Sequence, residues 1–357
     1  MSDSLEDFLL RLPTPAGSGA ALNCRVLLRR GIEGHPFPGR ADESQAAGVS
    51  SIVETAIRQA GRFDCLNLSR AGSLDRMTAV ERDLVPQSFA VQGGGLVALG
   101  RDAPVWCTVN EIDHLRIRAE ASGADLGQAY ARASEIDSLL AESLDYAFSP
   151  DAGYICAEIA DWGTGLSASV TVHLPALAMA GLVDRALRTA LDAGLSVRGF
   201  WSDESASSGA LYELETPRGA WTDEESILLR LGDAVDRIEA YEKGAREELV
   251  SHDPESVRDA VYRAFGTARY ARRVGYDEGA ETLSRLRLGA WAGMIDGLSG
   301  NRASGGFYGL RNAHLLKYLA KEGVYDPSET PDTGRVEEAR ARVLRSLVSE
   351  ATLVEVP

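Results

Sequence analysis

The sequence predicts an α+β protein, in which a part that contains a β-sheet is followed by an all-helical part. Strand-like runs recur from Asn23 to the segment that begins at Tyr212, and Ser167–Leu174 shows a clear alternation of apolar and polar residues. Amphipathic helical patterns separate these runs, and only helical patterns follow the charged stretch Glu239–Pro254. With 357 residues, of which 45% are hydrophobic, the chain is long enough to bury two cores.

The elements of the first part are expected in a definite order after a loosely held lead-in at residues 1–20. Glycines 93–95 predict a hairpin turn rather than a phosphate loop, because no Gly-Lys-Ser/Thr sequence follows them. The expected strands are Asn23–Arg30, Phe89–Leu99, Val105–Ile117, Ser167–Leu174 and one from Tyr212, and the expected helices are Glu43–Gly61, Leu126–Phe148, Ala176–Ala193 and one from Thr222.

The second part is expected to contain helices only. Helical spacing of apolar residues recurs in Val257–Gly266, Glu281–Gly289 and Gly334–Glu350. The charged stretch before these segments marks the boundary between the two parts. The chain is therefore divided into residues 1–20, 21–245 and 255–357.

The net charge and the cysteines of the chain indicate which partners and which cellular compartment to expect. The net charge of −16 argues against nucleic acid and anionic membranes as partners. It suits a basic partner such as an arginine-rich protein segment, although solubility alone also explains it. The four cysteines are scattered without metal-binding spacing, and no apolar run is long enough to span a bilayer. These features predict reduced thiols in a cytoplasmic protein without a metal site of its own.

The most specific pattern lies in the stretch Gly153–Pro175. An apolar run leads into the turn Gly163-Thr164-Gly165, which is followed by the strand expected at Ser167–Leu174. A strand, a glycine-rich turn and a second strand can place backbone N–H groups around an anion. Gly-Thr-Gly alone is a weak signal, because most such turns only change the direction of the chain.

Together with three other segments, this stretch resembles the ATP:guanido phosphotransferases, most closely the bacterial protein-arginine kinases. The family's Gly-Thr-Gly-Leu-Arg-Ala-Ser-Val and Asn-Glu-Glu-Asp-His-Leu-Arg motifs correspond to Gly163–Val170 and Asn110–Arg116. Its arginine-rich strand corresponds to Asn23–Arg30, and its mobile Arg-Gly-x-Tyr-Gly-Glu-x-Ser loop to Arg198–Ser205. The resemblance implies a phosphagen-kinase-type catalytic domain, with a twisted, largely antiparallel sheet wrapped by helices, followed by a helical domain.

The resemblance also implies roles for the charged residues that match. Arg25, Arg116 and Arg198 match arginines that bind the phosphates of ATP, a role that suits the forked donors of a guanidinium. Asp203 matches a loop glutamate, so that a carboxylate remains there, one methylene shorter. From the residues alone, Arg25 is explained as part of a basic surface strand. Arg116 is explained by ion pairs at a strand end, and Arg198 and Asp203 by a pair across a surface loop.

Four positions depart from the family pattern. Leu27 and Ser167 stand where further phosphate-binding arginines are expected, and Ile112 replaces a glutamate that orients the substrate guanidinium. Glu158 stands where the family has its reactive cysteine. The nearest thiol, Cys156, lies two residues earlier and reaches that position only if the chain bulges, so it is expected to be packed and inert.

The helical part departs from the family pattern as well. Val336-Glu337 align with the Arg-Asp pair around which that family builds a phosphoarginine-binding site. Valine cannot supply the guanidinium of the arginine that it replaces, so the phosphoarginine site is not carried over to this chain.

The expected function is that of a protein-arginine-kinase-like protein with a degraded active site, acting as a pseudokinase or a regulatory binding module. One alternative is an active ATP-dependent protein-arginine kinase that uses Glu158 and Asp203 in place of the family's cysteine and glutamate. Another is a structural oligomer built on the helical part. ATP and Mg²⁺ are the expected cofactors if nucleotide binding is retained. The expected partner is an arginine-containing or regulatory protein, and a homodimer is also considered.

Overall fold

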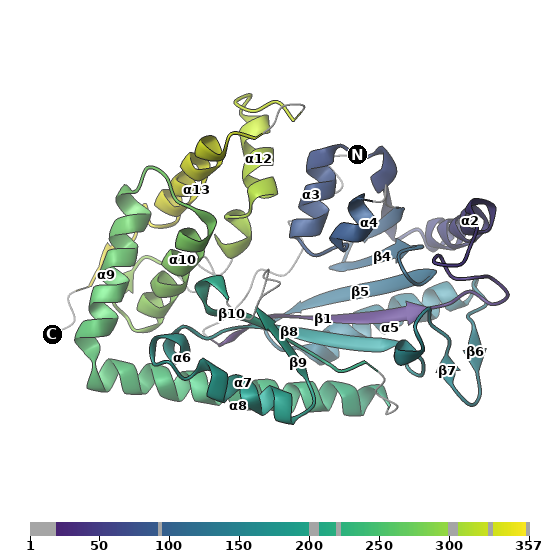
Figure 1. Ribbon diagram of the computed structural model, residues 1–357, viewed down its shortest axis with the longest axis horizontal. Coiled ribbons are helices and arrows are strands. Elements are labelled where there is room, and N and C mark those ends of the chain that lie inside the picture. The colour runs from purple at the N-terminus through teal and green to yellow at the C-terminus, as the bar shows by residue number, and fades with distance from the viewer. Residues whose placement is uncertain are drawn as a thin grey trace.

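An eight-stranded antiparallel sheet forms the centre of the protein (Figure 1). The computed structural model describes residues 19–91, 95–199, 207–218, 223–298, 306–327 and 331–354. The strand order is β2-β3-β4-β5-β1-β8-β10-β9, and each neighbouring pair is antiparallel. The strands are β1 (Ala21–Arg30), β2 (Phe63–Asn67), β3 (Leu96–Gly100), β4 (Val105–Val109), β5 (Leu115–Ser122), β8 (Leu166–His173), β9 (Ser196–Gly199) and β10 (Leu211–Glu215).

Helices surround this sheet and make up most of the chain after it (Figure 1). Around the sheet lie α2 (Glu43–Ala60), α3 (Ser73–Glu81), α4 (Gln87–Val91), α5 (Leu126–Ala141), α6 (Pro175–Met179), α7 (Val183–Asp192) and α8 (Glu224–His252). The helical part contains α9 (Pro254–Tyr270), α10 (Tyr276–Trp291), α12 (Asn312–Lys321) and α13 (Thr333–Leu347). Shorter elements are the ribbons β6 (Phe148–Ser149) with β7 (Gly153–Tyr154) and β11 (Ile295–Asp296) with β12 (Thr352–Leu353), and 3₁₀ turns at Leu68–Arg70, Ile159–Asp161 and Ser208–Ala210.

The central strands have one apolar face and one polar face. Because successive side chains of a strand point to opposite faces, the alternation in the sequence decides which residues share a face. On the apolar face, Val26 of β1, Ala119 of β5 and Ala168 of β8 lie side by side in register. On the polar face, arginine, serine, threonine and glutamate side chains occupy the intervening positions of β5, β1, β8 and β10.

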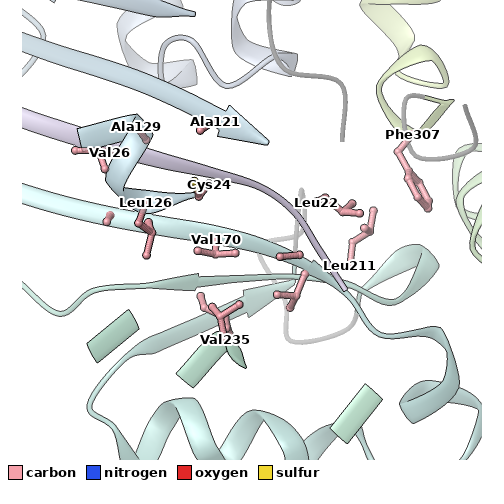
Figure 2. Packing of buried hydrophobic residues seen from close by; sticks show 14 of the residues in the cluster. Leu22, Cys24, Val26, Ala121, Leu126, Ala129, Val170, Leu211, Val235 and Phe307 are labelled. Atoms are coloured by element: carbon pink, nitrogen blue, oxygen red, sulfur yellow. The ribbon is translucent and has the colours of Figure 1, made fainter. Parts of the chain in front are cut away.

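The apolar face packs against α5 and α8. Figure 2 shows Val26 and Val170 of the sheet close to Ala129 of α5 and Val235 of α8. Each of these four side chains is fully buried, with an exposed fraction of 0%. This large core holds β1 and β8 rigidly, and it leaves their opposite, polar face to form the functional surface.

Two other groups of residues cover the ends of the polar face. Over β2 to β4, a small separate core gathers around Trp106 and includes Leu84 and Phe89 from the α3–α4 segment. At the far end of β8, the helical part closes over His173, whose Nε2 lies 2.8 Å from Ser284 Oγ. Arg287 donates to His173 Nδ1 over 2.6 Å, and burial lowers the pKa of this histidine. The middle of the polar face lies between these two covers.

Several expected elements are present with the bounds that the sequence predicts. Helix α2 begins after Asp42, which forms a capping box with Gln45, and it ends at Gly61 in a left-handed conformation. Helix α8 begins after Asp223, whose side chain accepts from the Ser226 amide. The strands expected around residues 23–30 and 167–174 are also confirmed.

Other expectations about single elements are wrong. The run Phe89–Leu99 is not one strand, because Phe89 lies in α4, where it packs into the small core, and β3 begins at Leu96. The helix expected at Leu126–Phe148 ends at Ala141. The helix expected at Ala176–Ala193 is divided by Gly181, whose φ of +68° is a left-handed conformation.

The charged stretch Glu239–Pro254, which was expected to mark the boundary, is almost entirely helical. Helix α8 continues through it to His252, and α9 begins at Pro254. Within it Glu242 is buried and accepts from the Ala176 and Leu177 amides at the start of α6. The division into residues 1–20, 21–245 and 255–357 stays a prediction.

The two faces of β1 predict different costs of truncation. Leu28→Ala, on the apolar face, is expected to lower the free energy of unfolding by about 2–5 kcal/mol, because it removes a buried side chain and leaves a cavity. The matched change Leu27→Ala, on the half-buried polar face, is expected to cost clearly less. Urea unfolding followed by tryptophan fluorescence measures both, and equal losses would contradict this account of the sheet.

Candidate active site

The uncovered middle of the polar face forms a cleft of about 300 Å³, which we call the arginine cleft. Its floor comes from β5, β1, β8, β10 and β9, and one wall comes from the segment between α3 and α4. The lining residues are Arg25, Leu27, Asp83, Val85, Pro86, Ser88, Glu111, Ile112, Arg116, Arg118, Ser167, Ala168, Ser169, Arg198, Glu213, Glu215 and Arg218. Described residues of all four sequence segments that carry family motifs line this one cleft.

A carboxylate shared by two arginines lies at one side of the cleft. Glu111 is ion-paired with Arg116 and lies 2.8 Å from Arg118, and Thr108 donates to the same carboxylate over 2.8 Å. Burial alone would raise the pKa of Glu111, but the two guanidinium groups outweigh it and hold that pKa below its ordinary value of 4.5. Both arginines are thereby held in fixed positions on the cleft floor.

Residues Asn110–His114 form a turn between β4 and β5, so the run Val105–Ile117 is not one continuous strand. Asn110 adopts a φ of +55° and donates to the Ala46 carbonyl, which bends the chain. Asp113 points away from the cleft, where it accepts from Arg116 Nε and from the Ala157 amide, both over 2.8 Å. His114 accepts from the Ile32 amide at Nδ1 and therefore donates from Nε2 to a backbone carbonyl. These two residues hold the fold, whereas Glu111 and Arg116 reach the cleft.

Arg25 and Arg198 lie at the other side of the cleft, and each meets a carboxylate. Arg25 is paired with Asp83 from the wall, and Arg198 is paired with Glu213 of β10. Burial raises the pKa of Glu213, and the nearby Asp83 carboxylate adds to the increase. The structure thus brings Arg25, Arg116 and Arg198 together in one cleft, as the motifs indicated.

Of the two predicted catalytic carboxylates, the structure describes the position of Glu158 only. Glu158 does not line the cleft; it is half-exposed near the rim and is paired with Arg218, which does line it. Asp203 lies outside the described residues.

The Gly-Thr-Gly turn packs against β1 rather than lining the cleft. The Arg29 amide donates to the Gly165 carbonyl over 2.9 Å, and a Cβ at Gly165 would lie 2.6 Å from the Arg29 carbonyl oxygen. Cys156 is buried beside the same backbone, with Sγ 3.8 Å from the Arg29 carbonyl oxygen. Burial raises the pKa of this thiol to about 12, and the nearby Asp113 carboxylate adds to the increase.

Sequence reasoning missed several residues of the cleft, chiefly Arg118, Arg218, Asp83 and Glu213. A period-two alternation of charges along β5 and β10 was the available signal for two of them, since Arg118 is two residues from Arg116 and Glu213 two from Glu215. Asp83 and Arg218 lie in connections between elements, and no local pattern in the sequence places them in the cleft.

The cleft residues fit the phosphates of a nucleotide better than they fit a guanidinium. Among the described lining residues are five arginines, four carboxylates and the hydroxyls of Ser167 and Ser169. Forked guanidinium donors suit phosphate oxygens, although a phosphate here must share arginines that already hold carboxylates. In contrast, Ile112 presents an apolar side chain, 41% exposed, where the family has a carboxylate.

Among the residues that the structure describes, no group of three or more histidine, cysteine, aspartate or glutamate side chains is arranged to hold a metal ion. Mg²⁺ usually binds through one or two carboxylates together with the phosphates of a ligand. Four carboxylates lie among the described residues of the cleft lining.

Comparison with known proteins agrees with the fold and the cleft. The family model described as "ATP:guanido phosphotransferase, C-terminal catalytic domain" matches residues 46–245, which is more than half of the chain. The chain belongs to this family. A second model, "Protein-arginine kinase McsB C-terminal domain", matches residues 254–352. The resemblance inferred from the motifs is thereby confirmed for both parts of the chain.

Individual relatives and solved structures are also similar to this chain. A protein-arginine kinase of Halothermothrix orenii is 33% identical over 304 residues, covering 84% of this chain and 87% of the relative. One of Brevibacillus brevis is 33% identical over 288 residues, covering 79% and 81%. The structure of a lombricine kinase aligns with a TM-score of 0.54 at 20% identity, covering 67% of this chain and 70% of that one. A duplicated taurocyamine kinase from Schistosoma mansoni gives a TM-score of 0.56 at 20% identity, covering 70% and 37%. These two confirm the phosphagen-kinase fold.

The shared carboxylate predicts a stability effect that depends on pH. Glu111→Gln is expected to lower the free energy of unfolding at pH 7 by about 3–5 kcal/mol, because buried Arg118 loses its carboxylate partner and Arg116 loses one of its two. The folded-state pKa of Glu111 is depressed, so its contribution is complete above pH 4.5 and is lost as the pH falls through that lower pKa. Denaturant unfolding at several pH values measures the gap between variant and wild type.

The control for this experiment is Glu54→Gln, which breaks an exposed i, i+4 pair with Arg58. It is expected to change stability by no more than about 0.5 kcal/mol. A Glu111→Gln variant as stable as this control at pH 7 would contradict the importance of the shared carboxylate.

Burial predicts that Cys156 is unreactive in the folded protein. At pH 8, iodoacetamide is expected to modify the half-buried Cys65 first and Cys156 only after unfolding in urea, because a thiol with a pKa near 12 is almost fully protonated. Mass spectrometry of tryptic peptides measures each site. Modification of Cys156 as fast as that of Cys65 would show that the thiol reaches solvent.

Proposed function

We propose that this protein is a catalytically impaired protein-arginine kinase, which keeps a site for nucleotide phosphates and has lost most of its capacity to transfer them. One observation carries the proposal: the two halves of the cleft are unequal. The part of the cleft that would bind phosphates contains five arginines. The part that would bind the substrate guanidinium presents Ile112, and its candidate carboxylate, Glu158, is ion-paired with Arg218 at the rim.

The phosphate half supports nucleotide binding. Arg25, Arg116 and Arg198 are the residues that would hold the phosphates of ATP, and when bound, ATP with its Mg²⁺ supplies the phosphoryl group of the family's reaction. Each guanidinium is oriented beforehand by a carboxylate, namely Asp83, Glu111 or Glu213. Such fixed donors lose little freedom when an anion binds.

The guanidinium half does not support efficient transfer. Phosphoryl transfer depends on holding the acceptor in line and on neutralising charge, rather than on covalent chemistry. Ile112 can neither accept a hydrogen bond from a guanidinium nor balance its charge. Cys156 is buried and its thiol is protonated, so it supplies no thiolate to the cleft.

A second candidate function is an active protein-arginine kinase. The names of the relatives, which are 33% identical over most of both chains, favour this candidate over a pseudokinase. In an active kinase, Glu158 would replace the family's cysteine and Asp203 would replace its loop glutamate. Glu158 would first have to leave Arg218, and the described residues do not include Asp203.

The proposals for the protein ligand, the cellular location and the oligomeric state are the same for both candidate functions. The proposed protein ligand carries arginine, in line with the relatives' name and the acidic net charge. A cytoplasmic location and a homodimer stay proposals. In the described part of the chain, each helix is too short or too polar to cross a membrane.

The proposal predicts little or no phosphoarginine from the unmodified protein. Incubation with Mg-ATP and an arginine-rich protein, followed by mass spectrometry for phosphoarginine, measures the activity. The double variant Ile112→Glu/Glu158→Cys, which repairs the guanidinium half, is expected to raise the yield by about 100-fold or more, since one preorganised contact is worth about that much.

The matched control is Leu27→Arg/Ser167→Arg, which alters only the phosphate half and is expected to stay inactive. Robust phosphoarginine from the unmodified protein, abolished by Asp203→Ala, would reject the impaired-kinase proposal and establish the active one.

A further inference from the structure

The arginine cleft contains two guanidinium groups that no family motif accounts for, those of Arg118 and Arg218. We propose that these two arginines bind nucleotide phosphates in place of the arginines that positions 27 and 167 lack. The inference rests on the proposed phosphate site, and it identifies which residues of this chain complete that site.

Arg118 is the direct neighbour of Leu27 on the cleft floor. The two residues are register partners in the antiparallel pair β5–β1, so their side chains leave adjacent positions on the same face of the sheet. Leu27 is in turn the register partner of Ser167 on β8. In the row formed by Arg118, Leu27 and Ser167, only Arg118 is cationic. Its guanidinium can reach the part of the cleft that an arginine at position 27 or 167 would reach.

The position of Arg118 is held firmly by its neighbours. One terminal nitrogen lies 2.8 Å from Glu111, and the other donates to Thr108 Oγ1 over 2.8 Å. A guanidinium has five N–H donors, so these contacts orient the fork and leave capacity for a ligand oxygen. Its side chain is 9% exposed, and that exposed part lines the cleft.

Arg218 lines the cleft from the connection that follows β10, on the side of β8 opposite to β1. Strand β10 pairs with β8 through Glu215 and Ser169, and the pairing continues where the Thr216 amide donates to the Ala168 carbonyl over 2.9 Å. Arg218 comes two residues after Thr216 and lines the same cleft as Ser167. It is 54% exposed and is held at the rim by Glu158, in an ion pair that a phosphate in the cleft can replace.

The count of arginines is therefore preserved while two positions have changed. With Leu27 on β1 and Ser167 on β8, the cleft lacks two guanidinium groups of the family pattern. Arg118 on β5 and Arg218 after β10 supply two others. Because Leu27 and Arg118 are register partners, the first exchange moves the base of the side chain by only about 5 Å, which the length of an arginine side chain spans.

The test is isothermal titration of the full chain with ATP, with and without Mg²⁺, and with adenosine by competition. Arg118→Gln and Arg218→Gln are each expected to weaken ATP binding about tenfold or more, the usual effect of losing a charged hydrogen bond, and to leave adenosine binding within about twofold. If Arg118→Gln does not fold, Arg118→Lys replaces it, since lysine keeps the charge and loses the fork.

The decisive arms are two rescue variants. Leu27→Arg in the Arg118→Gln background, and Ser167→Arg in the Arg218→Gln background, are expected to restore ATP affinity to within about threefold of wild type. A purely structural role for Arg118 or Arg218 would not be restored in this way. The matched controls are Arg30→Gln, a buried arginine paired with Asp137 on the other face of β1, and Arg101→Gln, an exposed arginine paired with Asp64. Both should leave ATP affinity unchanged.

The outcomes separate this inference from the proposed function. Wild-type protein that binds ATP while both glutamine variants bind it equally well overturns the inference alone. Equal weakening of ATP and adenosine, or failure of both rescue variants, also overturns it. Wild-type protein that binds no ATP with or without Mg²⁺ overturns the inference and the nucleotide-binding proposal together.

Discussion

The pairing of buried charges across the polar face of the sheet is the constraint on which the rest of the structure depends. Arg25, Arg116 and Arg118 lie on strands whose other face is packed into the main core, so they cannot turn toward solvent on that side. Buried guanidinium groups are tolerable only with partners, and the carboxylates of Asp83 and Glu111 supply them. The same pairing that stabilises this face also aims the arginines into one cleft.

The helical part supports the wall of that cleft. The guanidinium of Arg82 lies over the ring of Tyr308, 3.9 Å from the ring centroid. Arg82 directly precedes the wall residue Asp83. Glu81, at the end of α3, accepts from the Ala313 amide at the start of α12 over 2.8 Å. Lys317 is paired with Asp75 over 2.7 Å. The wall is thus clamped between the sheet and the helical part, which explains why the two parts of the chain form one continuous set of contacts.

Prediction from the sequence succeeded where one local rule decided the outcome and failed where packing competed with it. The strand at β8 follows from strict alternation, and the ends of α2 follow from its cap residues. Phe89 has strand propensity, yet it belongs to α4, because the small core around Trp106 needs its ring. Helix α8 runs through a charged stretch because Glu242 is buried against amides of α6, a contact that its own sequence does not reveal.

By itself the sequence determined the family, the two faces of the central strands and the convergence of Arg25, Arg116 and Arg198, because period-two alternation and chain order are local properties. Only the tertiary structure decided which charges share the cleft. Arg118 and Leu27 are neighbours through strand register, whereas Asp83 and Arg218 reach the cleft from connections between elements. Cys156 and Glu158 likewise stand two residues apart in the chain, and packing buries one while it leaves the other at the rim. Burial and register are set by contacts distant in sequence, and these are the properties that local patterns do not contain.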